Sequence, residues 1–443
     1  MKLVIIGGGG FRIPGVYEAI AADDAPVRID DLVLYDVSAD RLETIRRVVD
    51  ALAPRFAHAP RVTASTDLAH ALAGADFVFS AVRIGGSAGR VTDERVALGL
   101  GLLGQETIGP GGLAYALRTL PFMTDLARTI REVAPDAWVI NFTNPAGIVT
   151  EAMRAVLGDR VVGICDTPIG LIRRALQAVG ATAGSEVSFD YVGLNHLGWL
   201  RGLVVDGRDA LPGLLASDAA LEEIEEARLM GFDWVRAIGA LPNEYLFYYY
   251  FAREARERIR AAAETRGEFL DRQQSAFFQE PGTDPLASWL RVRHEREASY
   301  MAESRESDEE RHAEDVDGGG YQRVALDLMA ALATGRSATM ILNVRNGGSV
   351  PQLPEDAVVE VGCRVDADGV HPLPIAPLSS EMLGLIAPVK AAERLVIAAA
   401  REGSRSLAWR AFAAHPLVDS VAVAEQLLAR YAAKFPEIDR LLC

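Results

Sequence analysis

The chain has 443 residues, of which 50% are hydrophobic and 24% charged, a globular composition that excludes an intrinsically disordered protein. Its 61 acidic residues outnumber its 45 basic ones, and the net charge of −16 argues against a nonspecific nucleic-acid binder and against a protein held on anionic lipid. Only three cysteines occur, so we expect no disulfide framework and a reducing, cytoplasmic location. The apolar stretch at residues 3–6 is too short for a signal peptide.

The first half of the chain alternates predicted strands with predicted helices. Short apolar runs rich in β-branched residues predict strands at residues 1–6, 31–36, 77–82, 137–142 and 161–165. Apolar residues spaced along one helix face predict helices at residues 16–22, 41–52 and 122–133. This alternation is typical of an α/β protein with a doubly wound, parallel, Rossmann-type sheet.

The second half of the chain has a different character. Further strands are predicted at residues 187–194, 198–205, 340–344 and 357–365, and helices at residues 218–266, 382–400 and 421–433. The charged stretch at residues 303–317 is interpreted as solvated surface. We therefore predict a dinucleotide-binding Rossmann domain over residues 1–170. A C-terminal α+β domain over residues 171–443 is expected to carry the substrate, metal and oligomer contacts.

Four consecutive glycines separate the first predicted strand from the first predicted helix. Glycines at such a turn let backbone N–H groups approach a pyrophosphate at the helix N-terminus. The second strand ends in Asp36, where an acid that binds ribose hydroxyls is expected, and an acid there favours NAD over NADP. Read separately, the glycines are only a turn and Asp36 only a helix cap. Their order along the chain instead predicts an NAD site formed by Gly7, Gly8, Gly9, Gly10, Phe11, Asp36 and Arg41.

Two side chains could hold a metal ion. Cys165 follows the fifth predicted strand, at the sheet edge where doubly wound folds bind their ligands. His196 lies at a tight break between the strands at 187–194 and 198–205. One thiolate and one imidazole leave open positions for substrate oxygens on a divalent cation. Taken alone the pair is weak, because a cysteine is more often a core residue and a single histidine more often a structural one.

Residues 242–250 contain four tyrosines, at positions 245, 248, 249 and 250. A helix whose tyrosines pack on both sides is the plainer interpretation. The alternative is that one phenol acts as a catalytic base, which requires nearby cations to lower its pKa. The chain has no convincing pair of acids of the kind that marks an ordinary glycosidase, and no GxSxG nucleophile motif.

Taken together, these motifs resemble the NAD-dependent family 4 glycoside hydrolases, most closely their 6-phospho-β-glucosidase branch. The resemblance runs from end to end, and the segments at 141–147 and 193–199 are its most specific parts. The other matching segments are residues 7–14, 83–86, 104–112, 163–166 and 343–346.

The resemblance implies hydrolysis without net redox change. NAD⁺ oxidises C3 of the sugar, a base removes the acidified C2 proton, the aglycone leaves, water adds and the hydride returns. It also implies a divalent cation, usually Mn²⁺, held by Cys165 and His196, with Tyr245 as the base at C2. The implied substrate is a phosphorylated disaccharide or aryl glycoside, and we expect a homodimer or homotetramer.

Three further residues are candidates for binding the sugar. By the same resemblance Glu106 and Asn144 are expected to contact it. Arg83 lies at a predicted strand end, and its planar guanidinium matches two phosphate oxygens, which makes it the candidate phosphate ligand. The alternative for Arg83 is a salt bridge at the domain surface.

Several positions depart from the family pattern. Asp166 stands where phospho-β members often carry Asn and phospho-α members Asp, whereas residues 240–243 lack the acid that α-acting relatives place upstream of the tyrosine. Glu244 is interpreted as a solvated residue at a helix start. Asp317 lies where relatives usually have a basic residue, which disfavours a 6-phosphate. Open alternatives are α-linked or unphosphorylated glycosides, an NAD-dependent dehydrogenase, and a non-enzymatic NAD-binding regulator.

Overall fold

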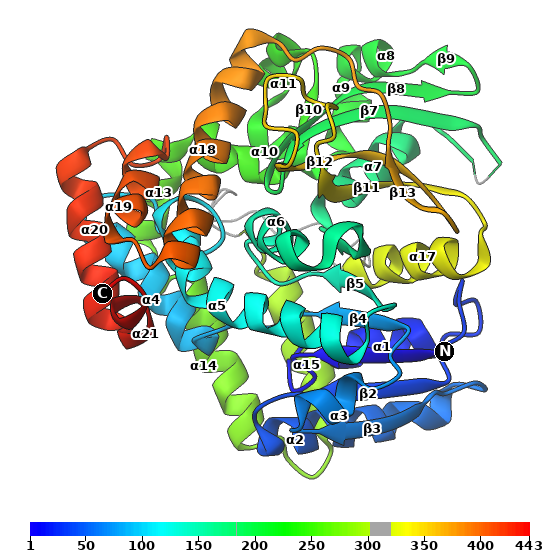
Figure 1. The fold of residues 1–443 in the computed structure, drawn as a ribbon. Helices are drawn as coiled ribbons and strands as arrows, with labels where there is room; N and C mark the ends of the chain where they lie inside the picture. Colours follow the sequence, from blue (N-terminus) through cyan, green and yellow to red (C-terminus); the bar gives the residue numbers. More distant parts are fainter. Residues whose placement is uncertain (183, 302–319) are drawn as a thin grey trace.

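The computed structural model describes residues 1–182, 184–301 and 320–443. Within them one sheet runs through the molecule, with blue to cyan parallel strands in the lower part of Figure 1 and green and gold antiparallel strands above. In chain order the strands are β1 (Lys2–Ile6), β2 (Asp31–Tyr35), β3 (Arg61–Ser65), β4 (Phe77–Ser80), β5 (Trp138–Asn141), β6 (Val161–Gly163), β7 (Val187–Leu194), β8 (Leu197–Val205), β9 (Arg208–Asp209), β10 (Leu241–Pro242), β11 (Ala338–Arg345), β12 (Val358–Asp366) and β13 (Gly369–Pro372).

The N-terminal part is a Rossmann-type sheet, as predicted. Its six parallel strands lie in the order β3-β2-β1-β4-β5-β6, the order typical of dinucleotide-binding folds. The five predicted strands of this half correspond to β1, β2, β4, β5 and β6. Strand β3 escaped the sequence analysis because it is largely exposed and carries no apolar run.

The antiparallel strands extend the same sheet instead of forming a separate one. Strand β11 pairs with β6 through Asn343 and Gly163, and β12, β7, β8 and β10 follow in turn. The four strands predicted in the second half correspond to β7, β8, β11 and β12, which confirms its α+β character. Since hydrogen bonds cross from residues before 170 to residues after it, the division at 170 stays a prediction.

Helices cover both faces of the sheet. They are α1 (Ile13–Ala21), α2 (Ala39–Leu52), α3 (Leu68–Leu72), α4 (Gly86–Leu98), α5 (Gly109–Val133), α6 (Ala146–Leu157), α7 (Thr167–Ala178), α8 (Leu211–Ala216), α9 (Asp218–Glu222), α10 (Glu225–Met230), α11 (Phe232–Ile238), α12 (Phe247–Tyr250), α13 (Ala252–Ala261), α14 (Arg266–Gln279), α15 (Pro285–Ala298), α17 (Tyr321–Thr334), α18 (Ser380–Glu402), α19 (Arg405–Ala414), α20 (Val421–Lys434) and α21 (Pro436–Leu441). Short 3-10 turns are η1 (Ala53–Arg55), η2 (Gly158–Arg160) and η3 (Glu244–Leu246).

Two predicted helices need correction. The helix expected at 122–133 begins at Gly109, because the glycine and proline residues at its start occupy its first turn and Pro121 lies inside it. The helical region expected at 218–266 is interrupted by β10 and η3, where Pro242 pairs with Trp199 of β8. This interruption matters because it places residues 244–246 against the sheet. The charged stretch at 303–317, with Asp317, lies outside the described residues.

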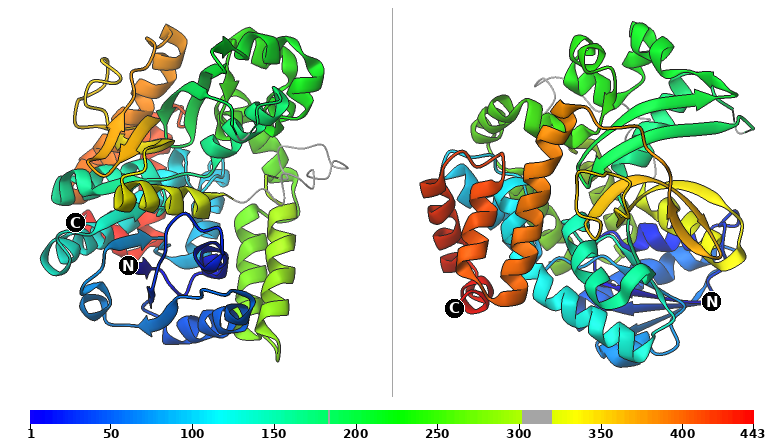
Figure 2. Two further views of the ribbon diagram at one scale, coloured as in Figure 1. Left: turned by 90° about the vertical axis from the view of Figure 1, so that its right-hand side faces the viewer. Right: turned by 45° about the horizontal axis from the view of Figure 1, so that its top comes forward.

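Two further groups of helices pack against the helices next to the sheet. Helices α18 to α21 pack on α4 and α5, where a buried Asp93–Arg118 pair (2.7 Å) accompanies a hydrogen bond of 2.8 Å from the Tyr431 hydroxyl to the Asp93 carbonyl. The light-green helices α14 and α15 run beside the blue N-terminal strands in the left view of Figure 2 and contact α4 and α2. None of the helices in the described part of the chain has the length and apolarity required to cross a bilayer.

Candidate active site

A cavity of about 1210 Å³ opens at the carboxyl ends of the parallel strands. Its wall combines the turn after β1, the loops after β4, β5 and β6, the turn between β7 and β8, and helices α14 and α15. Every site residue predicted from the sequence lines this cavity except Gly8 and Gly9, which pack behind it. The topology thus gathers residues from position 7 to position 245 in one place.

The glycine turn has no room for side chains. Gly7 has a φ of +91°, and a Cβ atom there would lie 2.7 Å from the carbonyl oxygen of Ala81. A Cβ atom on Gly8 would lie 2.7 Å from that of Leu34 on β2. No side chain therefore covers the backbone of this turn, which lets a pyrophosphate approach it closely.

Asp36 is held beside this turn by the backbone. Its carboxylate accepts hydrogen bonds from the N–H of Gly9 (3.1 Å) and the N–H of Ser38 (3.0 Å). Arg41 donates from Nε to the carbonyl of Gly9 (3.3 Å), and its guanidinium lies 4.0 Å from the ring centre of Phe278. Since a carboxylate accepts about four hydrogen bonds, Asp36 retains capacity for ribose hydroxyls.

Phe11 joins the turn to the helices of the second half. Its carbonyl accepts a 2.8 Å hydrogen bond from the indole N–H of Trp289 on α15. Its ring packs edge-on against Phe277 of α14, with 5.4 Å between centroids. Contacts between residues as far as 278 positions apart in the sequence therefore close one side of the cavity.

Arg83 and Glu106 form an ion pair inside the cavity, not a bridge on the surface. Arg83 donates from Nη1 to Glu106, and Arg90 lies 2.6 Å from the other carboxylate oxygen. Burial opposes ionisation of Glu106, but the two guanidinium groups outweigh it and lower the pKa to about 2. Because Arg90 also pairs with Glu94 (2.8 Å), the positive charge on this wall is largely compensated.

The two candidate metal ligands face the same cavity. Cys165 follows β6 and its Sγ lies 3.4 Å from the Thr167 hydroxyl, while His196 occupies the β7–β8 turn with a φ of +65°. Burial lowers the pKa of His196 to about 3, so the ring is neutral and keeps a lone pair. Its Nδ1 is buried and has no hydrogen-bond partner among the described residues.

These ligands do not form a closed metal centre. No group of three or more His, Cys, Asp or Glu side chains in the described part of the chain could hold an ion. Burial raises the pKa of the Cys165 thiol, and Glu360 and Asp166 add to that shift. A two-ligand site of this kind leaves coordination positions for substrate oxygens.

A buried polar network supports both candidate ligands from behind. Glu360 on β12 accepts hydrogen bonds from Asn343 (2.8 Å), Tyr191 (3.1 Å) and Asn195 (3.2 Å), the residue before His196. Burial raises the pKa of Glu360 to about 7. No sequence pattern marks Glu360, since a lone acid inside a predicted strand carries no signal of its own.

Tyr245 lies directly against the candidate metal site. Its ring stacks on His196 with 3.7 Å between centroids and 8° between planes. Asn243 fixes the backbone by accepting the N–H of Tyr245 (3.0 Å) and donating to the Thr167 hydroxyl (2.7 Å). The interruption of the helical region thus turns one tyrosine of the cluster toward the pair.

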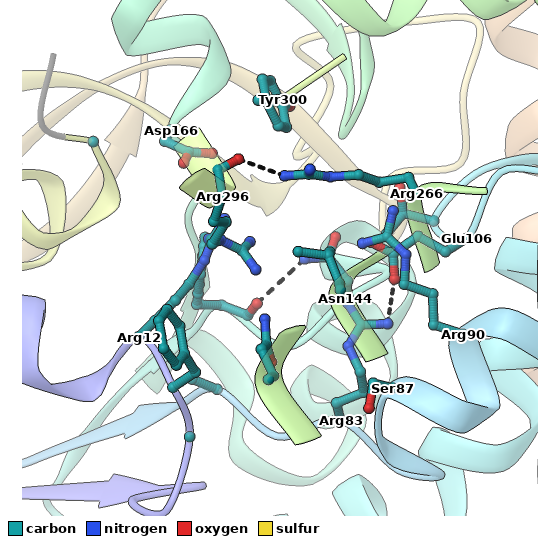
Figure 3. Close-up of a pocket in the computed structure, with 18 of the residues that line it drawn as sticks. Arg12, Arg83, Ser87, Arg90, Glu106, Asn144, Asp166, Arg266, Arg296 and Tyr300 are labelled. Carbon is teal, nitrogen blue, oxygen red and sulfur yellow. Dashed lines mark hydrogen bonds and ion pairs between the residues drawn. The ribbon is translucent and has the colours of Figure 1, made fainter. Parts of the chain in front are cut away.

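The cavity is also lined by a group of arginines that no sequence pattern marks. Figure 3 shows Arg12 and Arg296 on one side of Asn144 and Arg90 and Arg266 on the other. Burial and the neighbouring guanidinium groups, Arg12 foremost, lower the pKa of Arg296 to about 9, with only Glu297 opposing. Guanidinium groups from three parts of the chain thus surround Arg296, whereas in the sequence Arg296 is one of several charged residues on an ordinary helix.

Comparison with known proteins identifies the family. The family model described as Family 4 glycosyl hydrolase matches residues 2–181, and the one described as Family 4 glycosyl hydrolase C-terminal domain matches residues 191–418. The chain belongs to family 4 of the glycosyl hydrolases. This confirms the resemblance found in the sequence and identifies the chain as a glycoside hydrolase.

Individual relatives of this family 4 hydrolase differ in specificity. The 6-phospho-beta-glucosidase BglT of Thermotoga maritima is 31% identical, over 97% of each chain. The 6-phospho-alpha-glucosidase 1 of Lacticaseibacillus paracasei is 28% identical, over 96% of this chain and 95% of its own. A solved structure of the Thermotoga maritima 6-phospho-beta glucosidase with manganese, NAD⁺ and glucose-6-phosphate is 27% identical, with a TM-score of 0.81 over 99% of both chains.

Proposed function

We propose that this family 4 hydrolase cleaves 6-phosphoglycosides, preferring β-linked ones, with NAD⁺ and a divalent cation as catalytic cofactors. The observation that carries the proposal is the convergence of three features on one cavity. These are the glycine turn with Asp36, the Cys165–His196 pair and Tyr245. Relatives of both anomeric specificities bear names that specify a 6-phosphate, which supports the substrate class.

The residues present fit both cofactors. The turn at Gly7 has no room for a Cβ atom, so its backbone stays free of side chains. Asp36 borders the cavity where a ribose would lie. The unpartnered Nδ1 of His196 among the described residues suits a cation held together with the Cys165 thiolate. When bound, NAD⁺ would accept a hydride from C3 of the sugar and the cation would polarise the neighbouring hydroxyl oxygens.

The side chains of the protein then have distinct roles. Tyr245 takes the proton from C2, and its stacking on His196 keeps the phenol beside the cation site. Burial raises the pKa of Tyr245, so the phenol ionises only when a cation is close. Asn144 Oδ1, buried without a partner among the described residues, accepts a hydrogen bond from a sugar hydroxyl.

Asp36 is expected to determine the choice of nicotinamide cofactor. An Asp36→Ala variant should raise the Kd for NAD⁺ by about 10- to 100-fold, because hydrogen bonds to a charged group contribute about 1.5–3 kcal/mol. It should also narrow the preference for NAD⁺ over NADP⁺, since the acid that repels a 2′-phosphate is gone. Titration of each cofactor followed by protein fluorescence measures both effects, and an unchanged Kd for NAD⁺ would contradict this assignment.

The cluster of guanidinium groups around Arg296 is the feature that suits a 6-phosphate best. The charge of Arg83 is paired with Glu106, whereas Arg296, which lies 3.3 Å from Glu297, also has the cations Arg12, Arg266 and Arg90 around it. An Arg296→Leu variant should raise KM for the phosphorylated substrate about 10- to 100-fold, the loss of a charge-assisted contact. KM for an unphosphorylated glucoside should stay the same, and an equal rise for both substrates would argue against phosphate recognition here.

The preference for β-linked substrates rests on residues 240–243, which offer no acid upstream of Tyr245. Asp166 is the residue that argues for the α alternative. Cleavage of 4-nitrophenyl 6-phospho-β-glucoside, compared with the α anomer and the unphosphorylated glucoside, tests the specificity. Omitting NAD⁺ and Mn²⁺ in turn tests the cofactors, and cleavage that persists without both would refute the mechanism. An NAD-dependent dehydrogenase would instead accumulate NADH in proportion to product.

A further inference from the structure

Glu244 is a buried acid in the cavity wall for which the proposed function gives no role. From the sequence it is expected to be a solvated residue at a helix start, but its exposed fraction is 4% because η3 packs against α10 and β8. We propose that Glu244, oriented by Tyr300, is the acid that protonates the departing glycosidic oxygen. The proposal rests on the proposed function, because it concerns the cleavage step of that reaction.

The geometry links Glu244 to the residue proposed as the C2 base. The Tyr300 hydroxyl donates to Oε1 of Glu244 at 2.6 Å and lies 3.4 Å from the Tyr245 hydroxyl. Figure 3 shows Tyr300 together with Asp166 at the end of the cavity away from Arg83. One hydroxyl therefore bridges two groups that must exchange protons with C2 and with the glycosidic oxygen of one sugar ring.

The surroundings keep Glu244 protonated at neutral pH. Two carboxylates from α10 face it, Glu225 and Glu226. Among the described residues the cation that acts on Glu244 is Arg174 of α7, which is bonded to Glu226 (3.0 Å from Nε) and lies 3.7 Å from Glu225. Burial, followed by those two carboxylates, raises the pKa of Glu244 to about 8, although Tyr300 and Arg174 oppose the shift. A carboxyl group with a pKa near the working pH is suited to general acid catalysis.

Protons and electrons balance in this step with water as the added reagent. Loss of the C2 proton leaves an electron pair that forms the C1=C2 double bond as the C1–O bond breaks. The departing oxygen takes the proton of Glu244 and leaves as an alcohol. In the second half, water adds at C1 and returns a proton to the Glu244 carboxylate, while C2 regains its proton from Tyr245.

The test compares two leaving groups on the holoenzyme with NAD⁺ and Mn²⁺. With methyl 6-phospho-β-glucoside, Glu244→Gln should lower kcat/KM by about 100-fold, within the usual contribution of a general acid. With the 4-nitrophenyl substrate the change should be much smaller, because nitrophenolate leaves without protonation. Glu264→Gln is the matched control, since Glu264 also lines the cavity but pairs with the exposed Arg272 (2.7 Å).

A second variant keeps the proposal testable if the glutamine variant does not fold. The Tyr300 hydroxyl stabilises the carboxylate form of Glu244, so Tyr300→Phe should shift the alkaline limb of the pH–rate profile upward from about pH 8. An equal loss on both leaving groups, no loss on either, or an unmoved alkaline limb would overturn the proposal. If the wild-type enzyme cleaves neither substrate, the proposed function itself fails, and this outcome is distinct from the others.

Discussion

Replacing Tyr245 with phenylalanine is expected to lower kcat by about 10³-fold, within the range of a lost general base. Phenylalanine keeps the ring that stacks on His196, 3.7 Å away, so the cavity and both cofactor sites should remain intact. Only the oxygen that takes the C2 proton is lost. The Kd values for NAD⁺ and Mn²⁺ should therefore stay at their wild-type level while turnover falls.

The decisive measurement for this variant is exchange at C2 of the substrate. Wild-type enzyme should exchange a C2 deuterium label with solvent, and Tyr245→Phe should retain it. Tyr248→Phe is the matched control, because Tyr248 lines the same cavity, is 2% exposed and lies 5.9 Å from Tyr245 between ring centres. Persistent exchange in Tyr245→Phe, or the same loss in the control, would exclude Tyr245 as the base.

Removing a candidate metal ligand is expected to abolish the cation-dependent reaction. Cys165→Ala or His196→Ala should each raise the Kd for Mn²⁺ by more than about 100-fold. Loss of a residue that only hydrogen-bonds to a metal ligand already lowers metal affinity by about 10- to 100-fold, and loss of the ligand itself should lower it further. The site has only these two candidate ligands among the described residues, so one remaining side chain could not hold the ion. Turnover should fall to the level seen without added metal.

Binding of the ion can be measured without any turnover. Titration of Mn²⁺ followed by electron paramagnetic resonance reports the Kd for each variant directly. Cys443→Ser is the matched control, because Cys443 is an exposed cysteine at the far end of the chain. Wild-type Mn²⁺ affinity in Cys165→Ala would refute the ligand assignment, and affinity lost equally in Cys443→Ser would indicate a nonspecific thiol effect.

Local pattern was sufficient to predict much of the fold. The strand, glycine turn, helix and second strand ending in Asp36 are contiguous in the sequence, so each signal supported the next. The motifs around Asn144 and His196 were specific enough to identify the family. Elements without an apolar pattern, such as β3, could not be predicted, because exposed strands lack the periodicity on which such predictions depend.

Charge and burial at the site could not be read from the sequence. Glu244 was interpreted as solvated, yet it is buried where η3 packs against α10 and β8, and its acid neighbours come from positions about 20 residues earlier. Arg83 was selected as the phosphate ligand, yet Glu106 partners it, whereas Arg12 and Arg296 meet across 284 positions. The charge of a site is a sum over neighbours in space, and those neighbours depend on the tertiary fold.

The sequence by itself therefore determined the family, the Rossmann-type half and the residue types from which the site is built. The tertiary structure decided that one continuous sheet joins both halves, through Asn343 and Gly163. It also decided which carboxyl groups are buried beside one another and which guanidinium groups gather at the cavity wall. The physical reason is that backbone periodicity is a local property, whereas desolvation and Coulomb interactions depend on distances between residues far apart in the chain.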